Sequence, residues 1–409
     1  MTARLRCSCG AIANPKAWAC KKRDTDEADH VLQLPIPKWW VDESSQQPFV
    51  RYRRMLWSWQ QAGDDGWFVA TAQRLDEAVA AIDGHGFEMS PCNEHKIASH
   101  RVTIKNETGN VSGSHKARHT FGLILHLLVR ERQQTTMHGT AATNKHSKRP
   151  RLAIASCGNA AVAAAVVAAA ERWPLSVFVP EEANPATVSY LKELGATVEV
   201  CPRTDDHPGD PSYARFRQAT QAGAVPFGCQ GPDNGYTFDG GRTLGYELAE
   251  QAPDIEQIYV QVGGGALASS VFQGLSAAQS RTRLIAVQVE GCAPLARAWR
   301  RIYNLGGLPQ ARAQRNAVMW PWTPTPTSAA SGILDDETYD WASVSEAMAA
   351  SEGYPVVVPE KLICEAWDTA RSATGINVSA TGSAGLAGLL HDNPPANTKT
   401  AVLFTGAQF

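Results

Sequence analysis

One lysine stands in a context suited to covalent chemistry with a carbonyl group. Lys116 follows Gly113-Ser-His and precedes an apolar run. The apolar residues of that run recur at helical spacing: Phe121, Ile124, Leu125 and Leu128. This spacing predicts a helix with Lys116 in its first turn and Ser112 or Ser114 as N-cap. The positive end of a helix dipole disfavours an ammonium ion, so a lysine there more readily offers a free amine for Schiff-base formation. Alone, such a motif more often holds a solvated lysine.

Two turns downstream add binding sites for anions. The turn Ser156-Cys-Gly-Asn159 lies between an expected strand at 152–155 and an alanine-rich helix at 160–171. Backbone N–H groups at such a helix N-terminus suit a carboxylate. The turn Gly263-Gly-Gly265 separates an expected strand at 257–262 from a helix at 266–275, and three glycines let the backbone approach a phosphate. A dinucleotide fingerprint would need different glycine spacing, so a phosphate loop is the better interpretation.

In order, these segments resemble the fold type II pyridoxal-phosphate enzymes, the tryptophan synthase β family. The motifs that carry the resemblance are Lys105-Asn-Glu107, Gly113-Ser-His-Lys-Ala-Arg118, Ser156-Cys-Gly-Asn159, Asp239-Gly-Gly-Arg-Thr-Leu-Gly-Tyr-Glu247, Val262-Gly-Gly-Gly-Ala-Leu267 and Leu403-Phe-Thr-Gly406. They cover residues 95–409. Within the family the sequence is most similar to threonine synthases and to threonine/serine dehydratases. His115, directly before the lysine, is instead similar to the His-Lys pair of tryptophan synthase β chains.

The resemblance implies a cofactor, pyridoxal 5'-phosphate, and a role for each matching residue. Lys116 would carry the cofactor and act as the catalytic base. Asn159 would bind the ring hydroxyl, and Thr405 would face the ring nitrogen. The phosphate would be held by Gly263, Gly264, Gly265, Ala266 and Leu267. The substrate carboxylate would be held by Ser156, Cys157 and Gly158.

The order of expected elements predicts the fold class. From residue 152 onward strands alternate with helices, which is typical of an α/β protein with parallel sheets. The resemblance implies two three-layer parallel-sheet domains with the cofactor in the cleft between them. We expect an N-terminal extension at 1–95 packed on the body, a small domain with the lysine at 96–225, and a large domain with the phosphate loop at 226–409. Residues 131–151 and 309–331 are expected to form exposed, irregular connections.

The composition excludes some classes of binding partner. The 409 residues contain 38 Lys and Arg against 40 Asp and Glu, so no strong field recruits nucleic acid or an anionic membrane. No apolar run reaches the roughly 18 residues of a membrane span, and the N-terminus lacks the apolar core of a signal peptide. We therefore expect a cytoplasmic enzyme. The resemblance implies an enzyme of amino-acid metabolism, with a small amino acid as substrate and a homo-oligomer, a dimer, as its assembly.

The cysteines raise the question of a metal. Cys7, Cys9 and Cys20 lie close in sequence, but they lack the paired Cys-x-x-Cys spacing of common zinc sites, and a fourth ligand would have to come from elsewhere, for example His30. We therefore favour free thiols and no metal, with zinc as the alternative. Cys157 is interpreted as a side chain that shapes the carboxylate loop and not as a nucleophile.

The reaction remains open between alternatives. A neutral hydroxyl at Thr405 cannot keep the ring nitrogen protonated as an aspartate would, which favours expulsion of a substituent over transamination. We therefore favour a lyase that eliminates a β-substituent from a small amino acid, similar to threonine/serine dehydratases. The first alternative is a threonine synthase acting on a phosphorylated homoserine, with Arg118, Arg242 and Lys105 as candidate phosphate ligands. The second is a non-catalytic binding protein on the same fold.

Overall fold

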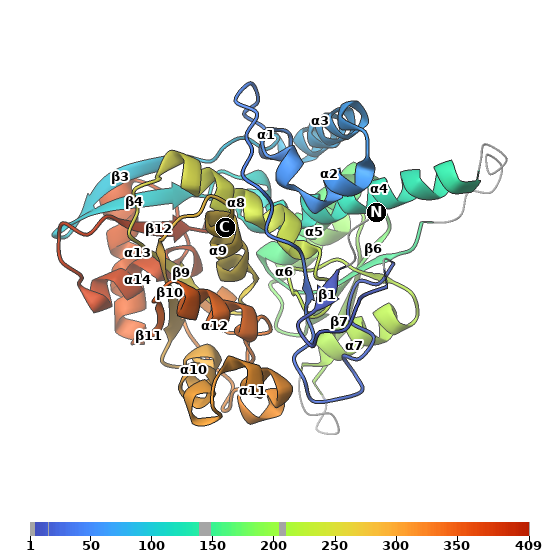
Figure 1. Ribbon diagram of the computed structural model, residues 1–409. Coiled ribbons are helices and arrows are strands. Elements are labelled where there is room, and N and C mark those ends of the chain that lie inside the picture. Colours follow the sequence, from blue (N-terminus) through green and yellow to red (C-terminus); the bar gives the residue numbers. More distant parts are fainter. Residues whose placement is uncertain (1–4, 15, 139–148, 204–209, 409) are drawn as a thin grey trace.

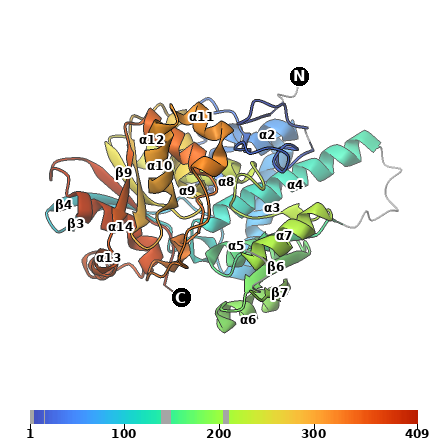
Figure 2. The same ribbon diagram turned by 90° about the horizontal axis from the view of Figure 1, so that it is seen from below.

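A computed structural model describes residues 5–14, 16–138, 149–203 and 210–408. Two sheets form two bodies that lie side by side, and the long helix α4 (Lys116–His138) extends along one of them (Figures 1 and 2). The α/β class with two parallel-sheet domains is therefore confirmed. Within the described residues no helix is long and apolar enough to cross a membrane.

The larger sheet has six strands in the order β11-β10-β9-β12-β4-β3. Its strands are β3 (Cys92–Ile97), β4 (His100–Asn106), β9 (Gln257–Gln261), β10 (Arg283–Val289), β11 (Tyr354–Val358) and β12 (Thr400–Phe404). All pairs are parallel except the edge hairpin of β3 and β4. Side chains alternate between faces: Ile258 and Val260 face one core, and Tyr259 faces the other.

Helices cover both faces of this sheet, as parallel sheets require. One core takes in α8 (Thr237–Gln251), α9 (Ala266–Ala277), α10 (Pro294–Asn304), α11 (Leu308–Ala313) and α12 (Trp341–Ala350). The opposite core is built from α13 (Glu360–Thr374) and α14 (Ala380–Asp392). The segment after β12 lies beside the start of α4, since Gly406 pairs with Ser114.

The smaller sheet has four parallel strands in the order β7-β6-β5-β8. They are β5 (Leu152–Ala155), β6 (Leu175–Pro180), β7 (Thr197–Cys201) and β8 (Val225–Pro226). The alanine-rich helix α5 (Asn159–Ala170) packs between this sheet and α4, because its small side chains allow close approach. Helices α6 (Pro185–Glu193) and α7 (Pro211–Gln221) complete this body.

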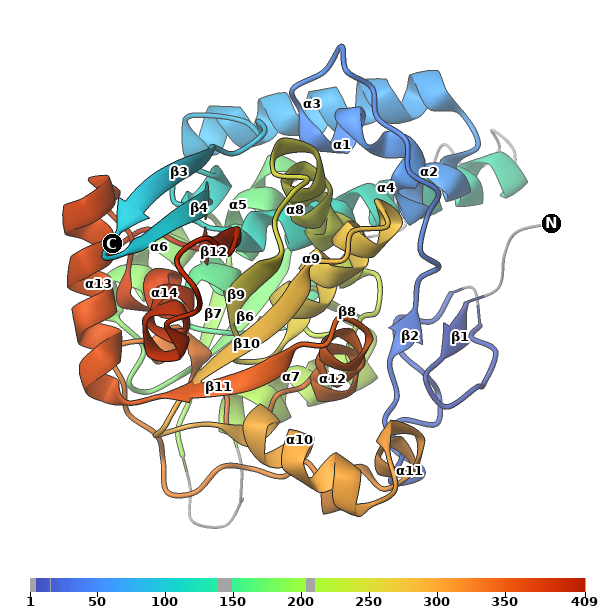
Figure 3. The ribbon, with the colours of Figure 1, turned by 60° about the vertical axis from the view of Figure 1, so that its left-hand side comes forward.

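The N-terminal part packs on both bodies. It contains β1 (Arg6–Cys7), β2 (Leu32–Gln33) and the helices α1 (Pro48–Arg51), α2 (Trp57–Ala62) and α3 (Asp65–Asp83), with α3 against α5 (Figure 3). Strands β3 and β4 span 92–106 and yet belong to the six-stranded sheet, so residue 95 does not divide the two sheets. The proposed domain limits thus remain sequence predictions.

Two expected loops contain helix. The segment 131–138 continues α4, because its polar residues form the solvated end of a helix whose buried stripe ends at Val129. Residues 139–148 of that expected loop lie outside the described residues. In 309–331, α11 and the short 3-10 turns Arg315–Ala317 and Ser331–Ile333 interrupt an otherwise irregular path, although its Pro and Thr content predicted none.

Candidate active site

Loops from both sheets surround one cavity of about 690 Å³. The lining includes every residue assigned to the site from the sequence: Lys116, Ser156, Cys157, Gly158, Asn159, Gly263, Gly264, Gly265, Ala266, Leu267 and Thr405. β9 and β12 end at the same edge of the larger sheet, and the turn after β5 of the smaller sheet lines the same cavity. The carboxyl ends of parallel strands are where α/β sheets bind ligands. The volume lies within the range of small-molecule sites, roughly 300–1,000 Å³.

Lys116 is the first residue of α4 and borders the cavity. The predicted buried stripe of this helix is confirmed at Phe121, Ile124, Leu125 and Leu128. The predicted N-cap is wrong: the hydroxyls of Ser112 and Ser114 are buried and have no hydrogen-bond partner within the described chain. The backbone N–H of His115 instead donates to the carbonyl of Thr405 at 3.1 Å, which ties the start of α4 to the end of β12.

His115 is a buried neutral base beside the lysine. One side of its ring is fixed, because Nδ1 lies 3.0 Å from the Thr405 carbonyl and must donate to it. Burial, followed by the neighbouring Lys116 charge, lowers the pKa of His115 well below its ordinary value. Its Nε2 is buried and lacks a hydrogen-bond partner within the described part of the chain. His115 borders the cavity, and its imidazole keeps one buried, unused acceptor.

Gly263, Gly264 and Gly265 form the turn between β9 and α9. Gly265 is the N-cap of α9 with φ of 99°, a left-handed conformation that glycine adopts without strain. A Cβ at Gly263 would overlap the carboxylate of Asp335, and one at Gly264 would lie 3.3 Å from Tyr339 Cδ2. The turn therefore combines free backbone donors of a helix N-terminus with a surface on which side chains would intrude, as a phosphate cradle requires.

The carboxyl group of Asp335 lies beside the same glycine turn that would bind the cofactor phosphate. Its carboxylate lies beside the backbone of Gly263 and Gly264, and burial raises its pKa to about 6. A bound phosphate would bring a second negative charge to the same turn, so the carboxyl must then be protonated or displaced. No sequence signal marked Asp335, because it lies far along the chain in the irregular segment before α12.

The turn after β5 begins α5, as the sequence predicted. Gly158 is the N-cap, and its N–H donates to Ser156 Oγ at 3.3 Å. Desolvation raises the pKa of the Cys157 thiol, which agrees with a loop-shaping side chain and not with a nucleophilic thiolate. The amide of Asn159 lies against Gly406, where a Cβ would stand 2.8 Å from its Nδ2.

Thr405 is oriented by a residue that the sequence did not reveal. Gln261 Nε2 donates to Thr405 Oγ1 at 2.8 Å and to the carbonyl of Gly382 at 2.7 Å. Because the hydroxyl oxygen accepts that bond, its own hydrogen is free to donate into the cavity. The available signal was a polar residue at the end of the otherwise apolar strand 257–262.

Three cations considered for a phosphorylated substrate lie elsewhere. Lys105 Nζ bonds Glu247 at 2.5 Å, and Arg118 joins the same carboxylate at 2.6 Å and Glu107 at 2.7 Å, all fully buried. Arg242 donates to the carbonyls of residues 34 and 35. These side chains stabilise the packing of the N-terminal part and α8 instead of reaching the cavity. His119, for which the sequence also allowed a surface position, is buried against the carbonyl of Thr237.

The charges that remain at the cavity are mostly negative. Among the described lining residues Lys116 is the one cationic side chain. The acidic lining residues are Glu182, Asp210, Asp233 and Asp335. Arg23 neutralises one of them, since its Nη1 lies 2.5 Å from Asp233 Oδ1. A substrate with a second phosphate would therefore meet carboxylates without compensating cations.

Fold and site together define a class of protein: α/β enzymes that bind a phosphorylated aldehyde cofactor on a lysine in a cleft between two parallel sheets. Residues 88–406 match the family model described as "Pyridoxal-phosphate dependent enzyme", and the chain belongs to that family. The residues present fit pyridoxal phosphate: Lys116, the glycine turn 263–265, where a side chain would intrude, and the hydroxyl of Thr405 all border one cavity.

Comparisons with individual proteins agree with the family. The chain is 28% identical over 199 residues to an L-threonine ammonia-lyase of Thermotoga maritima, covering 48% of this chain and 43% of that protein. It is 26% identical over 238 residues to a serine racemase of Oryza sativa subsp. indica, covering 58% and 63%. The chain thus spans about half the length of these relatives. The processed form of threonine deaminase isoform 2 from Solanum lycopersicum shares the fold with a TM-score of 0.60, at 17% identity over 85% of this chain and 86% of that one.

Proposed function

We propose that this chain is a pyridoxal-phosphate-dependent lyase that eliminates a β-substituent, such as a hydroxyl group, from a small amino acid. The observation that carries the proposal is the hydroxyl of Thr405, oriented by Gln261 at the end of β12 where the family places the ring nitrogen. A neutral donor there leaves the ring a moderate electron acceptor, which favours loss of a leaving group over prolonged carbanion storage. The dehydratase and ammonia-lyase relatives support the same reaction type.

Each group at the cavity has a defined task in this reaction. When bound, pyridoxal phosphate supplies a carbonyl that condenses with amines and a ring that accepts electrons. Lys116 would hold that group and then, as a free amine, remove the Cα proton of the substrate. The electron pair of the broken Cα–H bond forms the Cα–Cβ double bond, and hydroxide leaves from Cβ with a proton as water. Hydrolysis of the enamine product gives ammonia and a 2-oxo acid.

Binding and orientation fall to the backbone. The turn 263–267 would hold the phosphate, and the turn 156–158 would hold the substrate carboxylate at the start of α5. Asn159 would position the ring hydroxyl. Burial keeps His115 neutral, so it adds no competing positive charge beside Lys116. The cavity offers no described cation for a substrate phosphate besides Lys116, which disfavours the threonine synthase alternative.

Racemisation is the second candidate, because serine racemases are among the relatives. Racemisation also begins with removal of the Cα proton, which is then returned from the opposite face. The test is a substrate screen of the purified holoenzyme with L-serine, L-threonine and O-phosphohomoserine. We expect ammonia and 2-oxo acid from a small hydroxy amino acid. Threonine and phosphate from O-phosphohomoserine would instead establish the synthase, and D-serine without ammonia would establish the racemase.

A further inference from the structure

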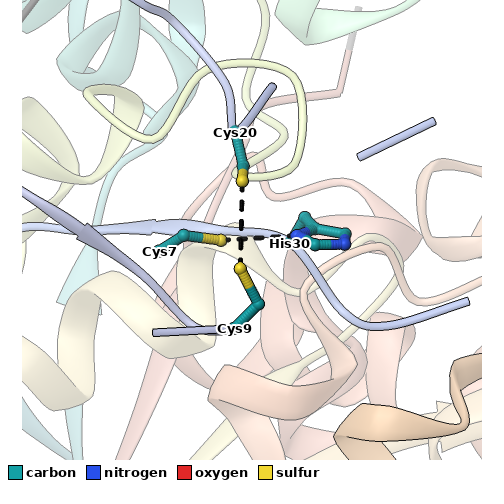
Figure 4. Close-up of side chains that lie close together, drawn as sticks. All are labelled: Cys7, Cys9, Cys20 and His30. Atoms are coloured by element: carbon teal, nitrogen blue, oxygen red, sulfur yellow. Dashed lines mark hydrogen bonds between the residues drawn. The ribbon is translucent and has the colours of Figure 1, made fainter. Parts of the chain in front are cut away.

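Three cysteines and one histidine converge outside the active site. Cys7, Cys9, Cys20 and His30 place one ligand atom each within 4.8 Å of one another (Figure 4). The Sγ atoms of Cys9 and Cys20 are 3.9 Å apart, and Cys7 Sγ lies 3.6 Å from His30 Nδ1. We infer that these four side chains form a structural zinc site, in place of the free thiols expected from their spacing.

The Cys9–Cys20 and Cys7–His30 distances match two edges of a zinc tetrahedron. With Zn–S near 2.3 Å and Zn–N near 2.0–2.1 Å, a tetrahedron places two sulfurs about 3.8 Å apart and sulfur and nitrogen about 3.6 Å apart. Three thiolates with one imidazole are a common donor set for structural zinc. All four positions are taken by protein, so the ion has no open position for water. The site therefore serves structure, not catalysis.

His30 is prepared as a ligand by a neighbouring carboxylate. Its Nε2 lies 2.7 Å from Asp26 Oδ1, so Nε2 carries the proton and Nδ1 turns its lone pair toward the sulfurs. A carboxylate on the far nitrogen is the usual outer partner of a zinc-bound histidine, because it fixes the tautomer and the ring orientation. The histidine is buried, whereas the side chain of Asp26 is 45% exposed.

The segment around this cluster has little hydrophobic core of its own, although Leu5, Val31 and Leu34 pack into the larger core of the smaller body. Its strands β1 and β2 have two residues each, and its own cluster of buried side chains consists of Cys7, Cys20 and Leu32. Two of these three are ligands. Small units of this kind depend on a metal or disulfides for stability.

The stapled segment joins both bodies of the enzyme. Arg23 bonds Asp233 at 2.5 Å and Tyr213 Oη at 2.5 Å, and both partners line the cavity. On the other body, the N–H of Asp29 donates to the carbonyl of Arg312 at 2.7 Å. The segment before β2 accordingly lies near α11 (Figure 3). The zinc ion would thus hold a strap across the two bodies at the cavity wall.

The direct test is the metal content of the purified full-length chain, measured by elemental analysis after extensive dialysis. We expect one zinc per chain in the wild type and in Cys364→Ser, an exposed cysteine far from the cluster. Cys20→Ser should retain little zinc, and Asp26→Asn should weaken zinc binding roughly 10–100-fold. Cobalt exchanged into the wild type should show the strong visible bands of tetrahedral thiolate coordination.

Two results would show that the four side chains do not form a zinc site. Zinc well below one per chain in both wild type and Cys364→Ser would overturn the inference, and so would a disulfide between Cys9 and Cys20 in peptide mapping. If Cys20→Ser does not fold, titrating the wild-type thiols with a mercurial keeps the test decisive, since zinc must be released as the thiols react. Lys21 and Lys22 have exposed side chains, and removal of the zinc by a chelator should unfold this segment and speed trypsin cleavage after both residues. Unchanged cleavage would contradict the strap.

Discussion

The negative charge of Asp335 should weaken binding of the cofactor phosphate by a measurable amount. Its pKa rises from 3.8 to about 6 because it is buried against the glycine turn. Ionising it in the folded protein therefore costs about 3 kcal/mol, at 1.36 kcal/mol for each factor of ten. Because the folded-state pKa is raised, this penalty is absent below about pH 4 and reaches its full size above about pH 6.

Asp335→Asn should remove the penalty while keeping the shape of the side chain and one oxygen beside Gly264. At pH 8 the variant should be more stable than the wild type by about 1–3 kcal/mol in urea unfolding of the cofactor-free protein, and nearly equal near pH 4. Its dissociation constant for pyridoxal phosphate at pH 8 should fall at least about tenfold, because a like charge leaves the phosphate cradle.

Asp336→Asn is the matched comparison, since this neighbour does not line the cavity but its charge contributes to the raised pKa of Asp335. It should change cofactor affinity much less than Asp335→Asn does. Weaker cofactor binding by Asp335→Asn at pH 8 would refute the argument, because the carboxyl would then support the phosphate instead of opposing it.

Three further changes probe the cradle, the ring contact and the buried ion network. Gly264→Val places methyl groups against Tyr339 and should weaken cofactor binding at least about tenfold with little change in unfolding; unaltered affinity would place the phosphate elsewhere. Thr405→Ser should keep most elimination activity, whereas Thr405→Asp should lower it sharply and raise racemisation or transamination. Equal product partition in the two variants would remove Thr405 from the site. Glu247→Gln should destabilise the protein by roughly 3–5 kcal/mol because Lys105 and Arg118 lose their shared carboxylate, while Glu94→Gln at an exposed pair should cost under about 1 kcal/mol; similar losses would refute the assigned role.

Local patterns predicted most of the α/β frame. The strands expected at 152–155 and 257–262 and the helices expected at 160–171 and 266–275 follow from apolar runs bounded by turn residues, and the structure places them within a residue or two of those limits. The edge hairpin of β3 and β4 escaped notice because its exposed positions carry polar residues without strict alternation. The polar end of α4 was predicted as a loop because it carries no apolar residues at helical spacing.

Site residues next to glycine turns were predictable, and residues that act across the fold were not. Lys116, Gly264 and Thr405 stand in recognisable contexts, so the sequence indicated that they would meet. Gln261 reaches the site through sheet packing, and its one local signal was that it is polar in an otherwise apolar strand. Asp335 reaches the site from a long irregular segment and left no local pattern. The four metal-ligand candidates failed a spacing rule because the chain brings Cys20 and His30 back by loops of irregular length.

The proposed site depends above all on a covalent link between Lys116 and the cofactor. The most direct measurement is borohydride reduction of the purified holoenzyme, followed by peptide mass spectrometry. The control variant is Lys96→Arg, because Lys96 is exposed, whereas Lys105 belongs to the buried ion network. The label should appear on Lys116 in wild type and in Lys96→Arg, and Lys116→Ala should lack both the label and turnover. Turnover by Lys116→Ala at the wild-type rate, or a label on another lysine, would contradict the account.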